Sequence, residues 1–165
     1  MFLDLSSEGS SNGNAAVLRA RIESVAFGAL PYDSVIVRRQ RVSDQDIAFE
    51  AVEESTSAPP SEQHSFIMVA FQFGDGAGGT ETLLRYVRDR APALERHGGR
   101  VYVSAVTPRN DRWCYDGFEL IEFPTPDAVQ NLMGDADYRA RTKNSAAVFG
   151  GEFSMARLAL AAVAA

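Results

Sequence analysis

Cysteine and histidine are scarce in this sequence. Among 165 residues there is one cysteine, Cys114, and there are two histidines, His64 and His97. A single thiol cannot form a disulfide within the chain, and it cannot build a zinc site made of cysteines. We therefore expect no metal, no tightly held cofactor and a reducing, cytoplasmic environment.

Basic residues are also fewer than acidic ones. The chain has 16 lysines and arginines against 22 aspartates and glutamates, which gives a formal net charge of −6. Phosphate backbones are bound by clustered cations that displace counterions, so this balance argues against a nucleic-acid partner.

Long hydrophobic runs are missing. The apolar stretch Leu158–Ala165 is about half the length of a membrane span and directly follows Arg157. The first 14 residues carry Asp4 and Glu8 in place of a basic segment followed by an apolar run. We expect neither a targeting segment nor a membrane partner.

A polar segment divides the chain into two unequal parts. Between Glu53 and His64 the adjacent Pro59 and Pro60 forbid a helix, and the polar residues around them cannot build a core. We therefore divide the chain into residues 1–57, a linker at 58–64 and a domain at 65–165.

The sequence of the second part predicts strands and helices in the order β-α-β-β-α-β. Its strands alternate or are apolar throughout. Its first helix has apolar residues at helical spacing, with charged residues including Arg90 on the other side. Thr80, Thr125 and Asp135 are suited to cap the three helices. The expected elements are a strand at Ser65–Phe73, a helix starting at Thr80 and ending before Gly98, strands at Arg100–Val106 and Gly117–Phe123, helices after Thr125 and Asp135, and a strand at Phe153–Leu160.

This order is typical of an α+β protein with an antiparallel sheet and helices on one face. The other face of such a sheet is apolar and needs a cover, since large bare apolar surfaces are rare on monomers. We therefore expect a ferredoxin-like βαββαβ domain that forms a dimeric α+β barrel, with a homodimer as the assembly.

The first part predicts a similar but shorter order. Its pattern suggests strands at Phe2–Leu5, Ser34–Val37 and Ile47–Val52 and a helix at Asn14–Phe27. This βαββ-like extension is either a degenerate half-repeat of the second part or an unrelated addition. If it is a half-repeat, it could take the place of a partner chain.

Several short motifs carry a family resemblance. They are His97-Gly98-Gly99-Arg100, Ile121-Glu122-Phe123-Pro124, Ala128 and Asp135-Ala136-Asp137-Tyr138, in this order. On these motifs, residues 66–160 resemble a bacterial family of unknown function in the dimeric α+β-barrel superfamily. The resemblance implies a ferredoxin-like fold and a homodimer, and it supplies no catalytic residues.

The loop between the second and third strands carries aromatic candidates. Trp113 and Tyr115 flank Cys114, and loops at this position border the cavity mouth in barrels of this type. The two rings could line a pocket for a flat organic ligand, with Tyr115 as a weak catalytic candidate. Alternatively, they plug the end of the core.

Polar residues on strands give further candidates. Arg100, Tyr102 and Ser104 alternate on one face of the second strand, and Glu119 and Arg157 interrupt apolar strands. Buried polar groups need partners, so Arg100, Tyr102, Glu119 and Arg157 are ligand-binding candidates, with Tyr102 also a catalytic one. Ion pairs or exposed edge positions are the alternatives. The odd spacing of Glu119 and Glu122 places them on opposite faces.

His97 is the third catalytic candidate, because its pKa lies near neutrality. It could act as a general base or as an axial haem ligand. The simpler interpretation is a histidine that stabilises the end of a helix.

The sequence leaves open whether the chain is an enzyme. Superfamily relatives include cofactor-independent monooxygenases, isomerases and cyclases, which favours binding of a small organic compound and such a reaction. The alternative is a non-enzymatic dimeric module that binds a ligand or a protein. Fold alone does not decide between them.

Overall fold

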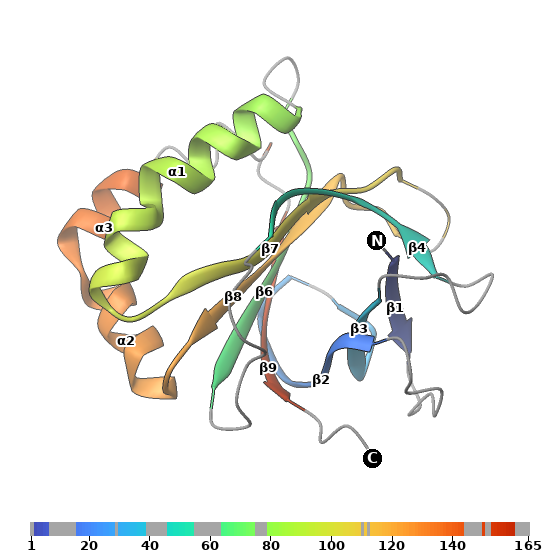
Figure 1. Ribbon diagram of the computed structural model, residues 1–165, viewed down its shortest axis with the longest axis horizontal. Coiled ribbons are helices and arrows are strands. Elements are labelled where there is room, and N and C mark those ends of the chain that lie inside the picture. The colour runs from blue at the N-terminus through green and yellow to red at the C-terminus, as the bar shows by residue number, and fades with distance from the viewer. Residues whose placement is uncertain are drawn as a thin grey trace.

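The computed structural model is a mixed α+β protein in which one curled antiparallel sheet forms a half-barrel (Figure 1). It describes residues 2–6, 16–28, 30–38, 46–54, 64–74, 79–109, 111, 113–143, 150 and 153–160. Within these residues there are nine strands and three helices. The strands are β1 (Phe2–Ser6), β2 (Ala16–Phe27), β3 (Ser34–Arg38), β4 (Ile47–Ala48), β5 (Glu50–Glu54), β6 (Ser65–Phe71), β7 (Arg100–Val106), β8 (Gly117–Phe123) and β9 (Phe153–Leu160), and the helices are α1 (Thr80–Arg96), α2 (Pro126–Gly134) and α3 (Ala136–Thr142).

The elements expected after residue 65 are confirmed. They follow in the order β6-α1-β7-β8-α2-α3-β9, and the bounds of β7, β8 and β9 are those expected from the sequence. In the sheet these strands lie in the order β9-β6-β8-β7. The helices form one layer on one face of these strands, with α3 beside α1 (Figure 1).

Helix α1 ends in a Schellman motif, which explains the glycine pair that follows it. Gly98 has φ +70°, the left-handed conformation that favours glycine. The N–H of Gly98 donates to the carbonyl of Glu95 (2.9 Å), and the N–H of Gly99 donates to that of Leu94 (2.9 Å). The chain therefore turns directly from α1 into β7.

The helix N-termini agree with the expected caps in two cases of three. Thr125 Oγ1 accepts a hydrogen bond from the N–H of Ala128 (3.3 Å) at α2. The carboxylate of Asp135 accepts from two backbone N–H groups at the start of α3. The expected cap at Thr80 is wrong: the N-cap of α1 is Gly79, with φ +136° and no side-chain hydrogen bond.

The helix expected at Asn14–Phe27 is wrong, because residues 16–27 form the long strand β2. Leu18 and Ala20 are buried and Ile22 is partly buried, whereas Arg21 and Glu23 are exposed, which is the period of a strand. β2 pairs with β3 on one side and with β9 on the other. These two partners satisfy the backbone groups that a helix would have paired internally.

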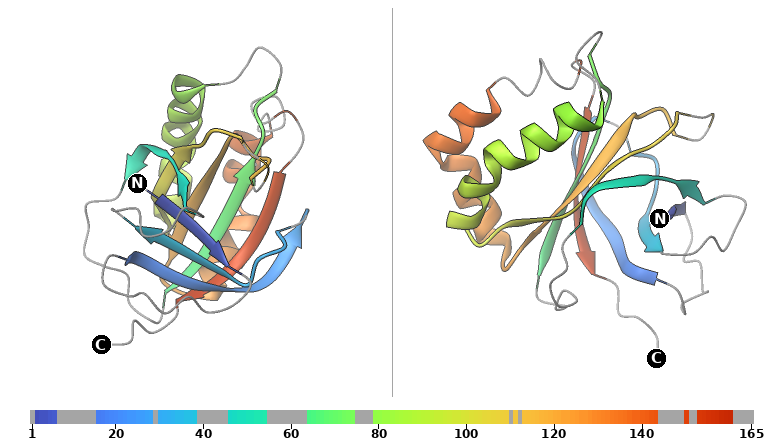
Figure 2. Two further views of the ribbon diagram at one scale, coloured as in Figure 1. Left: turned by 90° about the vertical axis from the view of Figure 1, so that its right-hand side faces the viewer. Right: turned by 45° about the horizontal axis from the view of Figure 1, so that its top comes forward.

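Strand β2 connects the two parts of the chain into one sheet. The strand order is β4-β1-β3-β2-β9-β6-β8-β7-β5, so strands of the first part extend both edges of the second. The outermost strands, β4 and β5, are separated in the chain by Phe49 alone. Their stretch pairs with β1 at its start and with β7 at its end, which brings the two ends of the curled sheet together (Figure 2).

The curled sheet encloses the larger core. Its buried side chains come from both parts of the chain, and the ring of Phe49 packs edge-on against that of Phe118, with 5.0 Å between centroids. The first part contributes Leu18, Ala20, Leu30, Val35, Val37, Ile47 and Phe49. The concave face that was expected to need a partner is thus packed against residues of the same chain. Of the expected linker at 58–64, residues 58–63 lie outside the described residues.

Candidate ligand site between the helices and the sheet

The two faces of β8 carry different chemistry. Phe118 and Leu120 point into the core enclosed by the curled sheet, while Ile121 belongs to the core beneath the helices. Since side chains alternate along a strand, Glu119 lies on the helix side and Glu122 on the concave side, as their odd spacing predicts. Both carboxylates are buried, with exposed fractions of 0 % and 2 %.

Glu119 forms a buried ion pair beneath α1. Arg90 Nη2 donates to Glu119 Oε1 at 2.5 Å, and Ser104 Oγ donates to the same oxygen at 3.2 Å. Arg90 is 2 % exposed. Burial is the largest effect and would lower the pKa of Arg90, but Glu119, Tyr86 and Tyr138 together outweigh it, so the pKa lies above its ordinary value. The arginine therefore remains charged inside the protein.

Two tyrosines surround this pair. Tyr86 OH accepts a hydrogen bond from Arg90 Nη1 at 3.5 Å, and the guanidinium carbon lies 4.5 Å from the centre of the Tyr86 ring. Burial raises the pKa of Tyr86 to about 12 and also raises the pKa of Tyr138, although the nearby charge of Arg90 opposes both shifts. Both hydroxyls are protonated at neutral pH. We call Tyr86, Arg90, Ser104, Glu119 and Tyr138 the helix-side cluster.

Two buried polar atoms of the helix-side cluster have no hydrogen-bond partner among the described residues. These atoms are Glu119 Oε2 and Arg90 Nε. Most buried polar atoms in proteins are paired, and an unpaired one is costly. One acceptor and one donor of this ion pair thus remain unpaired beneath α1.

Glu119 was expected among the buried polar residues, whereas Arg90 was expected on the side of its helix opposite the apolar residues. Arg90 follows Val87 by three positions and precedes Leu94 by four, so it lies in the buried stripe of α1. An arginine inside an apolar stripe requires a buried acid, and Glu119 within an apolar strand is its complement. That pair of signals was visible in the sequence.

The prediction that Ser104 shares a face with Arg100 and Tyr102 is wrong. The pairing of β7 with β8 shifts between Val101 and Val103, so Ser104 lies opposite Glu119 on the helix side. Such an irregularity places one extra residue in a strand and changes the face of those that follow. Tyr102 stays on the concave side, where its ring is edge-on to Phe66 with 5.6 Å between centroids.

The aromatic candidates of the β7–β8 loop pack inside the concave core. Trp113 is 1 % exposed, and its Nε1 donates to Thr107 Oγ1 at 2.6 Å. Its ring contacts that of Tyr115, whose hydroxyl lies 2.5 Å from Ser154 Oγ. The structure thus brings Trp113 and Tyr115 together, at the end of the core where β8 begins.

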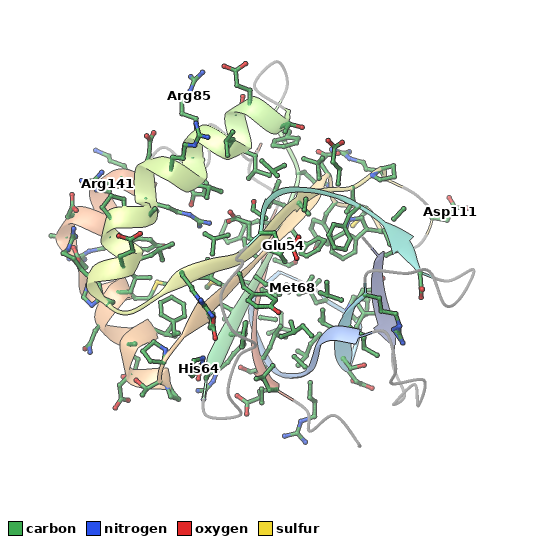
Figure 3. All side chains as sticks on the ribbon, in the orientation of Figure 1. Glu54, His64, Met68, Arg85, Asp111 and Arg141 are labelled. Atoms are coloured by element: carbon green, nitrogen blue, oxygen red, sulfur yellow. The ribbon has the colours of Figure 1, made fainter. Side chains whose placement is uncertain are left out.

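Arg100 lies at the opposite end of the same face. Its Nε donates to Glu122 Oε2 at 2.5 Å, and His64 Nδ1 contacts Glu122 Oε1. Figure 3 shows His64 at the start of β6 and Met68 further along that strand, inside the curled sheet. Arg100 and Tyr102 are therefore near each other but separated by the core from Trp113 and Tyr115.

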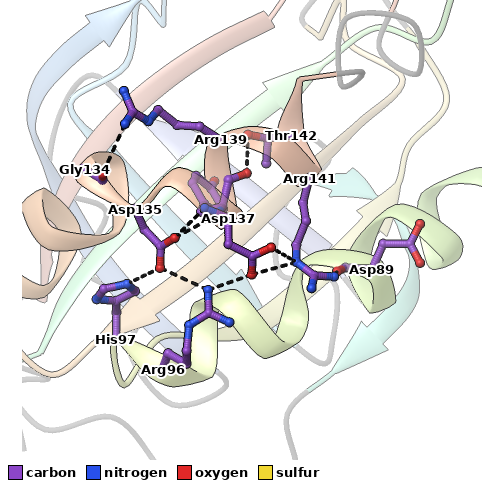
Figure 4. A network of polar contacts seen from close by, with 10 residues as sticks. Asp89, Arg96, His97, Gly134, Asp135, Asp137, Arg139, Arg141 and Thr142 are labelled. Carbon is purple, nitrogen blue, oxygen red and sulfur yellow. Dashed lines mark hydrogen bonds and ion pairs between the residues drawn. The ribbon is translucent and has the colours of Figure 1, made fainter.

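His97 and Arg157 lie away from both groups. Figure 4 shows His97 Nε2 at 2.8 Å from Asp135 Oδ2, in a network that also joins Arg96 to Asp135 and Asp137. Ligation of a haem iron by this nitrogen would require breaking its contact with Asp135. Arg157 pairs with Glu23 on β2, with 2.9 Å between Nε and Oε2.

The described residues offer neither a metal site nor a membrane-spanning helix. No group of three or more His, Cys, Asp or Glu side chains there is arranged to hold a metal ion. None of the three helices described is long and apolar enough to cross a membrane.

The fold defines an α+β half-barrel, and comparison with solved structures gives neighbours of that kind. A structure described as a major regulator of staphylococcal pathogenesis has a TM-score of 0.58 at 11 % identity and covers 88 % of this chain and 86 % of its own. A "putative monooxygenase" from Lactobacillus acidophilus has a TM-score of 0.50 at 8 % identity and covers 93 % and 80 %. A protein of unknown function from Rhodopseudomonas palustris has a TM-score of 0.47 at 22 % identity and covers 60 % and 83 %.

At these identities the likenesses show the fold alone. The first two cover more of the chain than residues 65–165 could account for, so the strands of the first part belong to the shared fold. No protein family model and no curated protein sequence matches the chain.

Proposed function

We propose that this protein binds a small organic molecule between the helices and the sheet, at the helix-side cluster. The observation that carries the proposal is the buried Arg90–Glu119 pair with an unpaired Glu119 Oε2 and an unpaired Arg90 Nε. A ligand with adjacent donor and acceptor groups would satisfy both atoms. Its binding would recover the cost of leaving them unpaired.

We further infer that residues 65–165 are a ferredoxin-like α+β barrel domain that can support a cofactor-independent reaction of monooxygenase, isomerase or cyclase type. The cluster has suitable groups for this chemistry. The charged Arg90 would stabilise a developing oxyanion, Glu119 would accept a proton and the protonated Tyr86 would donate one. The Lactobacillus neighbour supports the fold, and the groups themselves support the reaction class.

The test uses benzamide, whose amide has an N–H donor beside a carbonyl acceptor. We expect benzamide to shift the backbone amide resonances of Arg90, Ser104 and Glu119 in a nuclear magnetic resonance titration. Glu119→Gln should weaken binding about tenfold or more, since a hydrogen bond to a charged group contributes roughly 1.5–3 kcal/mol. Glu95→Gln, on the exposed side of α1, is the matched control and should bind like the wild type.

Two results would contradict the proposal: no shift at these amides with benzamide at millimolar concentration, or equal binding by Glu119→Gln. N,N-dimethylbenzamide, which lacks the donor, should bind more weakly than benzamide. Mass spectrometry of compounds recovered after incubation then separates an enzyme from a binding module, because only an enzyme returns an altered compound.

A further inference from the structure

The concave face holds a second polar group that the proposed function does not use. His64, just before β6, directs its Nδ1 at Oε1 of Glu122 on β8. The other carboxylate oxygen, Oε2, accepts from Arg100 Nε at 2.5 Å. Because Glu122 and Glu119 lie on opposite faces of β8, this group is separate from the helix-side cluster.

The contacts of Glu122 determine which nitrogen of His64 carries the proton. The Glu122 side chain is 3 % exposed, and its two oxygens face Arg100 Nε and His64 Nδ1. A carboxylate paired with a guanidinium accepts hydrogen bonds and does not donate them. His64 Nδ1 must therefore be the donor. In the neutral ring this leaves Nε2 with an open lone pair.

Nε2 is placed to react with a molecule from solvent. The His64 side chain is 33 % exposed, and among the described residues its Nε2 has no hydrogen-bond partner. A buried carboxylate that fixes the imidazole while the far nitrogen stays open is the arrangement of activated catalytic histidines. The second histidine differs, because Nε2 of His97 is itself bound to Asp135.

We propose that His64 and Glu122 form a catalytic dyad that hydrolyses small, uncharged esters of phenols. His64 Nε2 attacks the carbonyl carbon, the N–C bond forms, and the C–O bond to the phenolate breaks. Glu122 accepts the hydrogen bond from Nδ1–H and stabilises the positive ring. Water then attacks the acyl carbon, the C–N bond breaks, and water's two protons pass to solvent or phenolate as the carboxylate product leaves.

Esters of phenols are the expected substrates because a phenolate is a better leaving group than an alkoxide. An imidazole nucleophile is a weak base with an ordinary pKa near 6.5, so it expels phenolates more readily than alkoxides. No oxidant, metal or further reactant is needed. Glu122 does not touch the ester, so it is a positioning residue for His64.

The experiment measures hydrolysis of 4-nitrophenyl acetate by the full chain from pH 5 to pH 9. We expect His64→Gln to lower the rate at least about tenfold, because it removes the nucleophile. We expect Glu122→Gln to lower the rate and to change its pH profile, because it removes the charge that orients and stabilises the ring. His97→Gln is the matched control and should hydrolyse like the wild type. A His64→Gln protein as fast as the wild type overturns the proposal, as does loss of activity in His97→Gln alone.

A measurement on the wild-type protein covers the case in which His64→Gln fails to fold. Diethyl pyrocarbonate acylates unprotonated imidazole nitrogens, and peptide mapping reports the rate at each histidine. We expect His64 to react several-fold faster than His97. An equal or slower rate at His64 would show that Nε2 is not open and would overturn the dyad.

Discussion

A single buried arginine accounts for most of the unusual chemistry beneath the helices. Arg90 takes an apolar residue's place in the buried stripe of α1, and among the described residues its charge is balanced by Glu119. Replacing a buried ion pair with apolar residues is often neutral or stabilising, so such a pair is weak evidence for a stabilising role. This favours a functional reason for keeping Arg90 and Glu119.

Variants at Arg90 and Glu119 should change the free energy of unfolding. Arg90→Met should lower the free energy of unfolding by about 3–5 kcal/mol, because it leaves the Glu119 charge buried without a partner. Urea denaturation measures the change. The double variant Arg90→Met/Glu119→Leu should recover most of the loss and no longer bind benzamide. A single variant as stable as the wild type would show that the pair is not buried in solution.

The candidate site could be predicted only in part. Glu119 stands out in the sequence because a charged residue within an apolar strand must have a partner. Ser104 could not be placed, since the irregularity between Val101 and Val103 arises from the pairing of two strands and has no signal in β7 alone. His64 was expected in the linker and not beside Glu122, since the two residues are distant in sequence.

Among the elements, the strands and helices after residue 65 were predictable and β2 was not. The former have local signals, such as the alternation of β7 and the cap at Thr125. Residues 16–22 contain alanine, leucine and arginine, which are strong helix formers. Apolar and polar residues also alternate there as in a strand, so the local sequence gives two competing signals. The strand is selected by the backbone pairing that β3 and β9 offer, which local propensity does not include.

The contact between α1 and α3 gives a prediction about acid stability. His97 first, and then the α3 backbone and Arg96, hold the pKa of Asp135 below its ordinary value. A depressed pKa contributes stability that is present above the unfolded value near 3.9 and is lost as the pH falls through the folded value. We therefore expect the free energy of unfolding to fall steeply below about pH 4.

Asp135→Asn tests this expectation. Asparagine can still cap α3, so the variant removes the charge and keeps the cap. Urea denaturation between pH 6 and pH 2 should show a lower free energy of unfolding at pH 6 and a shallower fall below pH 4. Asp127→Asn, in the exposed first turn of α2, is the control. An unchanged slope in Asp135→Asn would contradict the assignment.

At the scale of the molecule, the first part of the chain covers the sheet of the second. The resemblance to dimeric barrels implied that a partner chain would bury the concave face. Here Phe49, Val35 and other residues of the first part are buried against that face, and the outermost strands β4 and β5 are short. Covered faces and short edges reduce the drive for two sheets to associate.

We therefore predict that the chain is a monomer in solution. Light scattering during size-exclusion chromatography should give the chain mass of 17.9 kDa across a hundredfold range of protein concentration. Twice that mass would mean that two chains associate through a surface other than the covered face, since opening that face would expose the apolar core.

The variant Phe49→Ala tests whether the first part of the chain covers the sheet in place of a partner. It should lower the free energy of unfolding by about 3–5 kcal/mol, because it removes a buried ring at the junction of β4 and β5. A dimer appearing only in that variant would show that the first part of the chain takes the place of a partner.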